Sequence, residues 1–122
     1  MPTHAINWFE IPVTDLDRAT AFYETILDAT LERMEIGTPV AVFPHDDDEG
    51  IGGALSLDGT KPSRDGALVY LDVDGHIADV VGRVPDAGGE VLLPVTVIGG
   101  DMGSYAYILD TEGNRVGLFS NS

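Results

Sequence analysis

The fold is decided by the stretch Asn7-Trp8-Phe9-Glu10-Ile11-Pro12-Val13, which is followed directly by Thr14-Asp15-Leu16-Asp17-Arg18-Ala19. Alternate residues of the first segment fall on two faces of an extended chain. One face is uniformly apolar and carries Phe9, Ile11 and Val13; the other is mixed and carries Trp8, Glu10 and Pro12. The alternation predicts a strand over residues 6–13 that packs its apolar face on a helix and lines a cavity with its mixed face.

A helix is predicted immediately after this strand. Thr14 or Asp15 can cap its first turn, because a short polar side chain there accepts from a free backbone N–H. Apolar residues then recur at helical spacing from Leu16 to Leu27, so the helix should bury one stripe. Strands predicted at 30–36, 39–44 and 52–57 complete a unit of one strand, one helix and three strands.

A weaker copy of this unit returns 60 positions later, where Val69, Leu71 and Val73 match Phe9, Ile11 and Val13. The copy predicts a strand from residue 67, a helix from about His76 that Pro85 shortens or kinks, and strands at 90–95, 104–109 and 115–120. One such unit leaves a sheet face uncovered, so two units should join. We expect one α+β domain of two βαβββ modules, about 4–58 and 66–121. A ferredoxin-like fold is the alternative, but it has too few strands after each helix.

Composition narrows the function classes. The 122 residues include no cysteine, which excludes disulfides, thiolate metal sites and cysteine nucleophiles. Six basic residues stand against 21 acidic ones, giving a net charge of −15. Nucleic acids and anionic membranes need basic patches, so neither is an expected partner. The charge favours a cationic ligand, or it serves solubility in a salty cytoplasm. No signal peptide or membrane span is predicted, and a cytoplasmic location is expected.

Several motifs together resemble the vicinal oxygen chelate superfamily, which includes glyoxalase I, bleomycin-resistance proteins and extradiol dioxygenases. They are the segments Ile11–Ala19, Phe22-Tyr23, Ala87-Gly88-Gly89 and Asp110–Arg115. The resemblance covers nearly the whole chain. It implies paired βαβββ modules that curl a mixed sheet around a cavity, and it implies a homodimer.

The resemblance also implies where a metal would be held. Metal-dependent members place His, Glu or Gln on the first and last strand of each module, because a divalent ion needs nitrogen or oxygen donors. Carried over by the nearest motifs, three of these positions fall on Trp8, Leu68 and Gly117, and the fourth lies within residues 52–57. None of these residues offers a donor side chain of that kind, so no metal and no other cofactor is expected. A weak divalent site formed by Glu10 and Asp72 is the alternative.

The mixed faces then predict a small-molecule pocket, because apolar walls with a few polar groups are typical of ligand sites. Its predicted binding residues are Trp8, Glu10, Leu68, Tyr70, Asp72 and Arg115, with Gly117 and Phe119 on the same faces. Arg115 is expected to pair with Asp72 or Glu10, since a buried unpaired charge is costly. Glu10 beside Trp8 should be partly desolvated, which suits a general base.

Three hypotheses follow for the function. The first is a metal-free pocket that binds a small organic ligand without transforming it, as bleomycin-resistance proteins do. The second is a metal-free or atypical lyase or isomerase of the glyoxalase type with Glu10 as its base. The third is a non-catalytic interaction protein whose pocket is filled by its own side chains. The sequence leaves open whether the chain is an enzyme.

Overall fold

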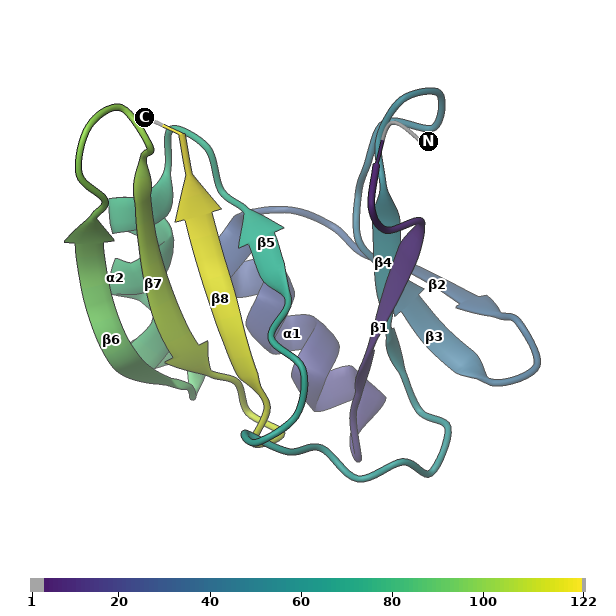
Figure 1. Cartoon of the computed structure of the whole chain (residues 1–122). Coiled ribbons are helices and arrows are strands. Elements are labelled where there is room, and N and C mark those ends of the chain that lie inside the picture. Colours follow the sequence, from purple (N-terminus) through teal and green to yellow (C-terminus); the bar gives the residue numbers. More distant parts are fainter. Residues whose placement is uncertain (1–3, 122) are drawn as a thin grey trace.

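The computed structural model describes residues 4–121, and it contains the predicted two modules (Figure 1). The first module consists of β1 (Trp8–Pro12), α1 (Leu16–Leu27), β2 (Glu32–Glu35), β3 (Pro39–Val42) and β4 (Gly52–Ser56). The second consists of β5 (Tyr70–Asp72), α2 (Ile77–Ala87), β6 (Glu90–Val97), β7 (Ser104–Leu109) and β8 (Arg115–Ser120). The predicted order of one strand, one helix and three strands is confirmed in both halves.

Each module forms one four-stranded mixed sheet. The strand orders are β1-β4-β3-β2 and β5-β8-β7-β6, so β1 and β5 are edge strands. Each edge strand runs parallel to its neighbour, β4 or β8, whereas the remaining pairs are antiparallel. The sheets curl without closing into a barrel, in agreement with the predicted α+β class.

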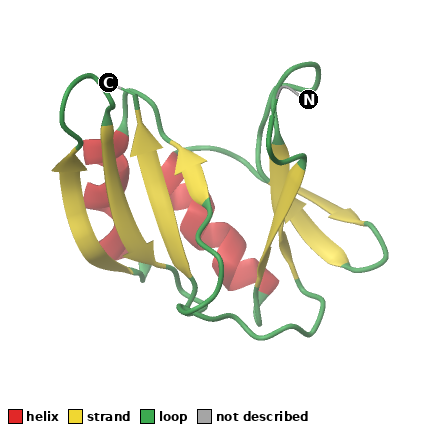
Figure 2. Ribbon diagram, in the orientation of Figure 1, coloured by secondary structure: helices red, strands yellow, loops and turns green. Residues whose placement is uncertain are grey.

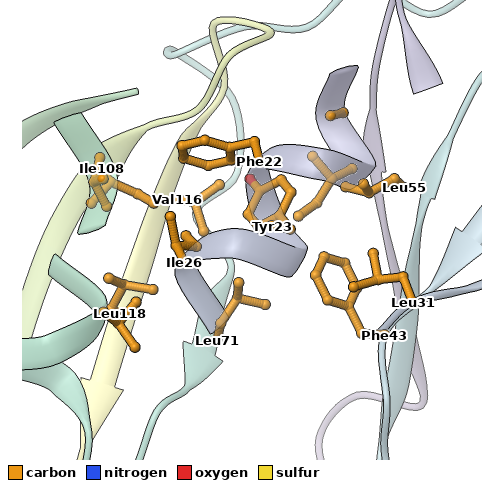
Figure 3. Close-up of a cluster of buried hydrophobic side chains, with 14 of the residues drawn as sticks. Phe22, Tyr23, Ile26, Leu31, Phe43, Leu55, Leu71, Ile108, Val116 and Leu118 are labelled. Carbon is orange, nitrogen blue, oxygen red and sulfur yellow. The ribbon is translucent and has the colours of Figure 1, made fainter. Parts of the chain in front are cut away.

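The helix α2 packs on one face of the second sheet, and α1 lies between that sheet and the first one (Figure 2). Figure 3 shows Phe22, Tyr23 and Ile26 of α1 with side chains of the second sheet on one side and of the first sheet on the other. The apolar face predicted for residues 9–13 takes part in this core, where Ile11 and Val13 are buried. The opposite face of each sheet is therefore turned away from the helices, and we call it the open face.

The helix ends follow from local chemistry. Asp15 caps α1, and its Oδ1 accepts from the backbone N–H of Arg18 at 3.0 Å. The helix α2 runs two residues beyond Pro85 to Ala87, and Gly88 caps it with a φ of +104°, which suits glycine better than any residue with a Cβ. The predicted stop at residues 87–89 is confirmed, and Pro85 shortens the helix little because it lies in the last turn.

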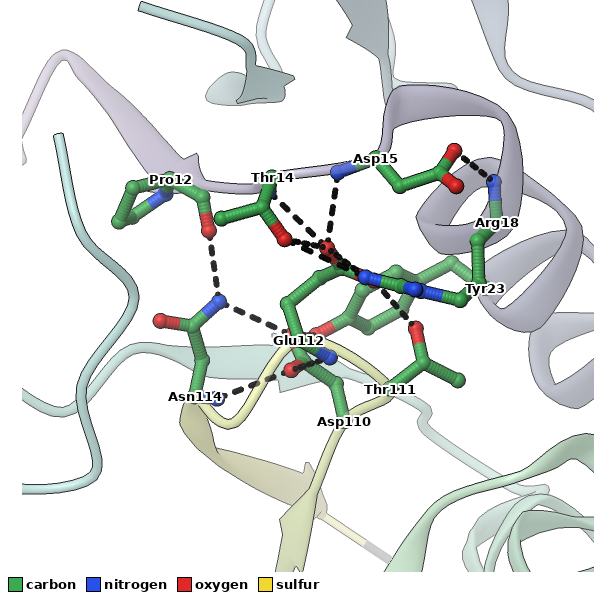
Figure 4. Close-up of polar contacts among 9 residues, drawn as sticks. All are labelled: Pro12, Thr14, Asp15, Arg18, Tyr23, Asp110, Thr111, Glu112 and Asn114. Atoms are coloured by element: carbon green, nitrogen blue, oxygen red, sulfur yellow. Dashed lines mark hydrogen bonds and ion pairs between the residues drawn. The ribbon is translucent and has the colours of Figure 1, made fainter. Parts of the chain in front are cut away.

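A network of polar side chains joins the modules (Figure 4). One oxygen of Glu112, in the turn after β7, accepts from the backbone N–H groups of Thr14 and Asp15 at 2.9 and 3.0 Å. The Arg18 guanidinium donates to both carboxylate oxygens, at 2.7 Å from Nε and 2.9 Å from Nη2. Glu112 thus supplies a carboxylate to the start of α1, where the helix dipole favours negative charge.

Asp110 and Asn114 extend this inter-module polar network into the core. The buried Asp110 carboxylate accepts from the Tyr23 hydroxyl at 2.7 Å and from the backbone N–H groups of Glu112 and Asn114 at 2.9 Å each. The Asn114 amide donates to the Pro12 carbonyl at 2.8 Å, at the end of β1. The residues that carry the family resemblance at 11–19 and 110–115 therefore lie together and fix the position of β1 relative to the second module.

Candidate functional site

The strand register identifies which side chains share each open face. On the first sheet, Trp8 pairs with Gly52 and Glu10 pairs with Ala54. On the second sheet, Tyr70 pairs with Gly117 and Asp72 pairs with Phe119. The β7 partners of Gly117 and Phe119 are Tyr107 and Tyr105. The mixed faces predicted from alternation are thus the open faces of the two sheets.

A cleft of about 980 Å³ lies between the two modules. Four of the six predicted binding residues line it: Trp8, Leu68, Tyr70 and Asp72. The C-terminal end of α1 and Arg83 of α2 also line it, and Arg83 donates from Nη1 to the Ile26 carbonyl at 3.0 Å. Apolar side chains dominate the lining, as expected for a site that takes small organic molecules.

Glu10 lies outside this cleft. Its side chain is exposed on the open face of the first sheet, and Oε2 accepts from the Trp8 indole N–H at 3.3 Å. The expectation that Glu10 is desolvated beside Trp8 is wrong for this structure, because the first sheet leaves that face in contact with solvent. Its neighbour Trp8 is itself 40% exposed.

Arg115 also lies outside the cleft, and its expected ion pair is not found. None of the ion pairs within residues 4–121 involves Arg115. The reason is distance along the sheet: Arg115 is four residues from Phe119, the partner of Asp72, or about 13 Å at 3.3 Å per residue. Its guanidinium instead lies over the Tyr107 ring, 5.7 Å from the centroid, and Nε is buried without a hydrogen-bond partner in the described chain.

A smaller cavity of about 600 Å³ lies on the open face of the second sheet. Its lining consists of Tyr70, Asp72, Ile98, Tyr105, Tyr107, Phe119 and Asn121. The hydroxyl groups of Tyr70 and Tyr107 are 3.1 Å apart. This hydrogen bond, helped by partial burial, raises the pKa of Tyr70 to about 12, so its phenol stays protonated at neutral pH.

Sequence reasoning missed Tyr105 and Tyr107 as cavity residues. The alternation of β7 contained the signal, because Tyr105, Tyr107 and Leu109 share one face and Ala106 and Ile108 share the other. The missing information was the pairing of β7 with β8, which decides that the tyrosines face the same side as Phe119.

His45 was also missed, because it lies in a loop after β3. Its ring lies over Gly52, so that a Cβ at Gly52 would come within 2.5 Å of the imidazole. The ring meets Trp8 edge to face, with centroids 6.2 Å apart, and Nδ1 is 3.0 Å from the Phe43 carbonyl. No sequence motif marked this placement. It adds an imidazole to the open face that carries Trp8 and Glu10.

The strand pairing indicates which residue corresponds to the fourth position that the resemblance implies for a metal ligand. Gly117, the position on the last strand of the second module, pairs with Tyr70. The 60-residue repeat carries Tyr70 onto Glu10, and Glu10 pairs with Ala54. The position left open within residues 52–57 is therefore Ala54, which has no donor atom on its side chain.

The donor set at these positions does not fit the metal centre that the resemblance implies. Trp8, Ala54, Leu68 and Gly117 supply no imidazole and no carboxylate. At Gly117 the space is already used, because an added Cβ would lie 2.5 Å from the Tyr70 ring. Across residues 4–121, no three His, Cys, Asp or Glu side chains gather in an arrangement that could hold a metal ion.

Neither helix of the described chain has the length and apolar character required to cross a bilayer. The longer one, α1, has 12 residues.

Comparison with known proteins agrees with this architecture. Residues 5–118 match the family model described as the Glyoxalase/Bleomycin resistance protein/Dioxygenase superfamily. A glyoxylase-like domain-containing protein of Didymella fabae is 28% identical over 120 residues, which cover 89% of this chain and 88% of that protein.

Two solved structures illustrate the likeness in fold. A glyoxalase/bleomycin resistance protein from Albidiferax ferrireducens T118 superposes with a TM-score of 0.74 at 13% identity, covering 96% of this chain and 98% of its own. A glyoxalase-related enzyme from Fulvimarina pelagi gives a TM-score of 0.70 at 16% identity, covering 94% and 86%. At these identities the likeness concerns the fold alone.

Proposed function

Because this chain belongs to the glyoxalase/bleomycin resistance protein/dioxygenase superfamily, we propose that it binds a small organic molecule on its open faces without a metal centre of the family's usual kind. The observation that supports the proposal is the absence of donor side chains at the four positions that the resemblance implies for metal ligands, together with the Tyr70 ring that fills the space at Gly117. What remains at those faces is an apolar and aromatic lining with isolated polar groups, which suits a binding site.

We further propose that two copies of the chain complete the site as a homodimer. Trp8 and Tyr70 both line the cleft between the modules, yet they remain 40% and 45% exposed, so one chain leaves this cleft open to solvent. Large apolar side chains are exposed near the sheet edges, among them Trp8, Met34, Tyr70 and Val97. A second copy would cover them and place one open face opposite the other.

The first test is the metal content of untagged protein after exposure to nickel, zinc, manganese and ferrous iron, followed by desalting. We expect less than about 0.1 equivalents of any metal to remain, because carboxylates alone at Glu10 and Asp72 would bind a divalent ion weakly. A thermal-shift screen of small organic molecules should then find ligands that raise the melting temperature. Stoichiometric metal that survives desalting would overturn the proposal.

A second candidate function is catalysis by Glu10, favoured by the Trp8 indole that orients its carboxylate and by His45 on the same open face. In this function Glu10 removes a proton from the bound molecule as a general base. Replacing Glu10 with Gln keeps the shape and removes the base, so turnover of any substrate found should fall at least about 100-fold. The control is Glu90→Gln, which makes the same change at an exposed residue at the start of β6. Equal turnover in the unchanged protein, in Glu10→Gln and in Glu90→Gln would exclude this role for Glu10.

A further inference from the structure

The smaller cavity has walls of aromatic rings set at steep angles to one another. The Tyr70 and Phe119 rings are nearly perpendicular, at 89° with centroids 6.4 Å apart. Tyr107 lies at 54° to Tyr70 and at 60° to Tyr105, with centroids 6.2 and 5.5 Å away. The four rings therefore do not stack in parallel, and all of them line the same cavity.

Asp72 is the one charged residue among those that line this cavity. One of its oxygens accepts from the backbone N–H of Asp74 at 3.0 Å, and the side chain is otherwise exposed. Arg115, a cation on the same face, lies one row further along the sheet with its guanidinium over the Tyr107 ring, and it does not line the cavity. The residues that line the cavity therefore carry a single negative charge, in a chain whose net charge is −15.

We propose that this cavity is an aromatic cage that binds an organic cation with a quaternary or tertiary ammonium group, with Asp72 as its counter-charge. Ring faces attract a cation through their quadrupole, and several faces around one ammonium group add their effects. The Tyr70 phenol contributes as a neutral ring, because its hydrogen bond with Tyr107 raises its pKa to about 12. The acidic surface raises the local concentration of cations and favours their approach. This inference rests on the proposed function and specifies its ligand class.

The test uses three probes of one shape: choline, its neutral carbon analogue 3,3-dimethylbutan-1-ol, and the anion 3,3-dimethylbutanoate. Each is titrated into isotope-labelled protein, and binding is followed by NMR shifts of residues around the cavity. We expect choline to bind about five- to tenfold more tightly than the neutral analogue, and the anion to bind most weakly. Choline affinity should fall as ionic strength rises, because Asp72 is exposed.

Matched variants distinguish the contribution of the ring faces to choline binding from the contributions of the hydroxyl groups and of the Asp72 charge. Tyr70→Leu removes a ring at an edge strand and should weaken choline binding about fivefold, whereas Tyr70→Phe keeps the ring and should change it less than about twofold. Tyr105→Leu and Tyr105→Phe repeat the comparison on a central strand. Asp72→Asn should weaken choline binding about threefold at low salt and leave the neutral analogue unaffected. Native-like spectra verify that each variant is folded.

The outcomes distinguish this inference from the proposed function. Equal affinity for choline and its neutral analogue, or the same choline affinity in Tyr70→Leu, Tyr105→Leu and Asp72→Asn as in the unchanged protein, would overturn the cage. So would the absence of any shift with choline. If the cage is overturned in any of these ways, the proposed metal-free binding of a small molecule still stands when the thermal-shift screen finds a neutral or anionic ligand. Metal that the protein retains after desalting would overturn the proposed function, whatever the result for the cage.

Discussion

Replacing Glu112 with Ala should lower the free energy of unfolding by about 3 kcal/mol, as measured by urea denaturation. The Glu112 side chain has no exposed area, yet it accepts from two backbone N–H groups, two hydroxyl groups and the Arg18 guanidinium. Hydrogen bonds to a charged group contribute about 1.5–3 kcal/mol each, and removal of one member of a shielded ion pair costs about 3–5 kcal/mol. The expected loss of stability lies at the low end of this range because Arg18 is half exposed and can be solvated in the variant.

The pH dependence gives a separate check. Burial opposes ionisation of Glu112, but the hydrogen bonds from Arg18, Thr14, Asp15 and Thr111 outweigh it and lower the pKa to about 2. A lowered folded-state pKa stabilises the protein above the unfolded value of 4.5, and this contribution is lost as the pH falls from about 4.5 to about 2. The stability difference between the unchanged protein and Glu112→Gln should therefore shrink over that window. A difference that stays constant down to pH 2.5 would contradict the assigned contacts.

The second large effect is expected for Asp110→Ala, at about 3–4 kcal/mol. Asp110 is 4% exposed and accepts from the hydroxyl of Tyr23, which is completely buried. Burial and the negative charge of Asp110 raise the pKa of Tyr23 well above its ordinary value, so this phenol is always a donor. The alanine variant leaves that donor and the N–H groups of Glu112 and Asn114 without their acceptor. Each of these groups that stays buried without a hydrogen bond lowers the free energy of unfolding by about 1–3 kcal/mol.

Tyr23→Phe is the matched control for this prediction. It removes one donor but leaves Asp110 bonded to the turn and to the Asn114 amide, so the loss should be only about 1–1.5 kcal/mol. Both variants are compared by thermal and urea unfolding with two spectroscopic probes. If Tyr23→Phe proved as destabilising as Asp110→Ala, the turn would not depend on the carboxylate, and the assigned role of Asp110 would be wrong.

The fold was largely predictable because strand alternation and helical spacing are local signals. Alternation in β1 correctly separated Ile11 and Val13, which are buried, from Trp8 and Glu10 on the open face. Strand ends were less accurate: β5 begins at Tyr70 instead of residue 67, and β6 extends to Val97 instead of residue 95. Where a strand begins and ends depends on its pairing with a strand distant in sequence, and the sequence of one segment carries no information on that pairing.

The candidate site was predictable only where it depends on one strand at a time. Alternation alone placed Tyr70 and Asp72 on a face that lines a cavity. The surroundings of Glu10 and Arg115 depend on how the two sheets sit about the helices, and no local pattern reports that arrangement. The role of Glu112 could not be predicted from local sequence for the same reason, because its partners in the first module lie 94 to 98 residues away.

The sequence separation of those contacts has a consequence for biosynthesis. The first turn of α1 acquires its carboxylate partner only after residue 112 has left the ribosome, although the helix itself is translated about 85 to 95 residues earlier. Contacts between residues so far apart in sequence form late, because a long loop must be closed first. The core surface of the first module therefore stays exposed until the second module has been synthesised. During that interval, chaperone binding or aggregation would compete with folding.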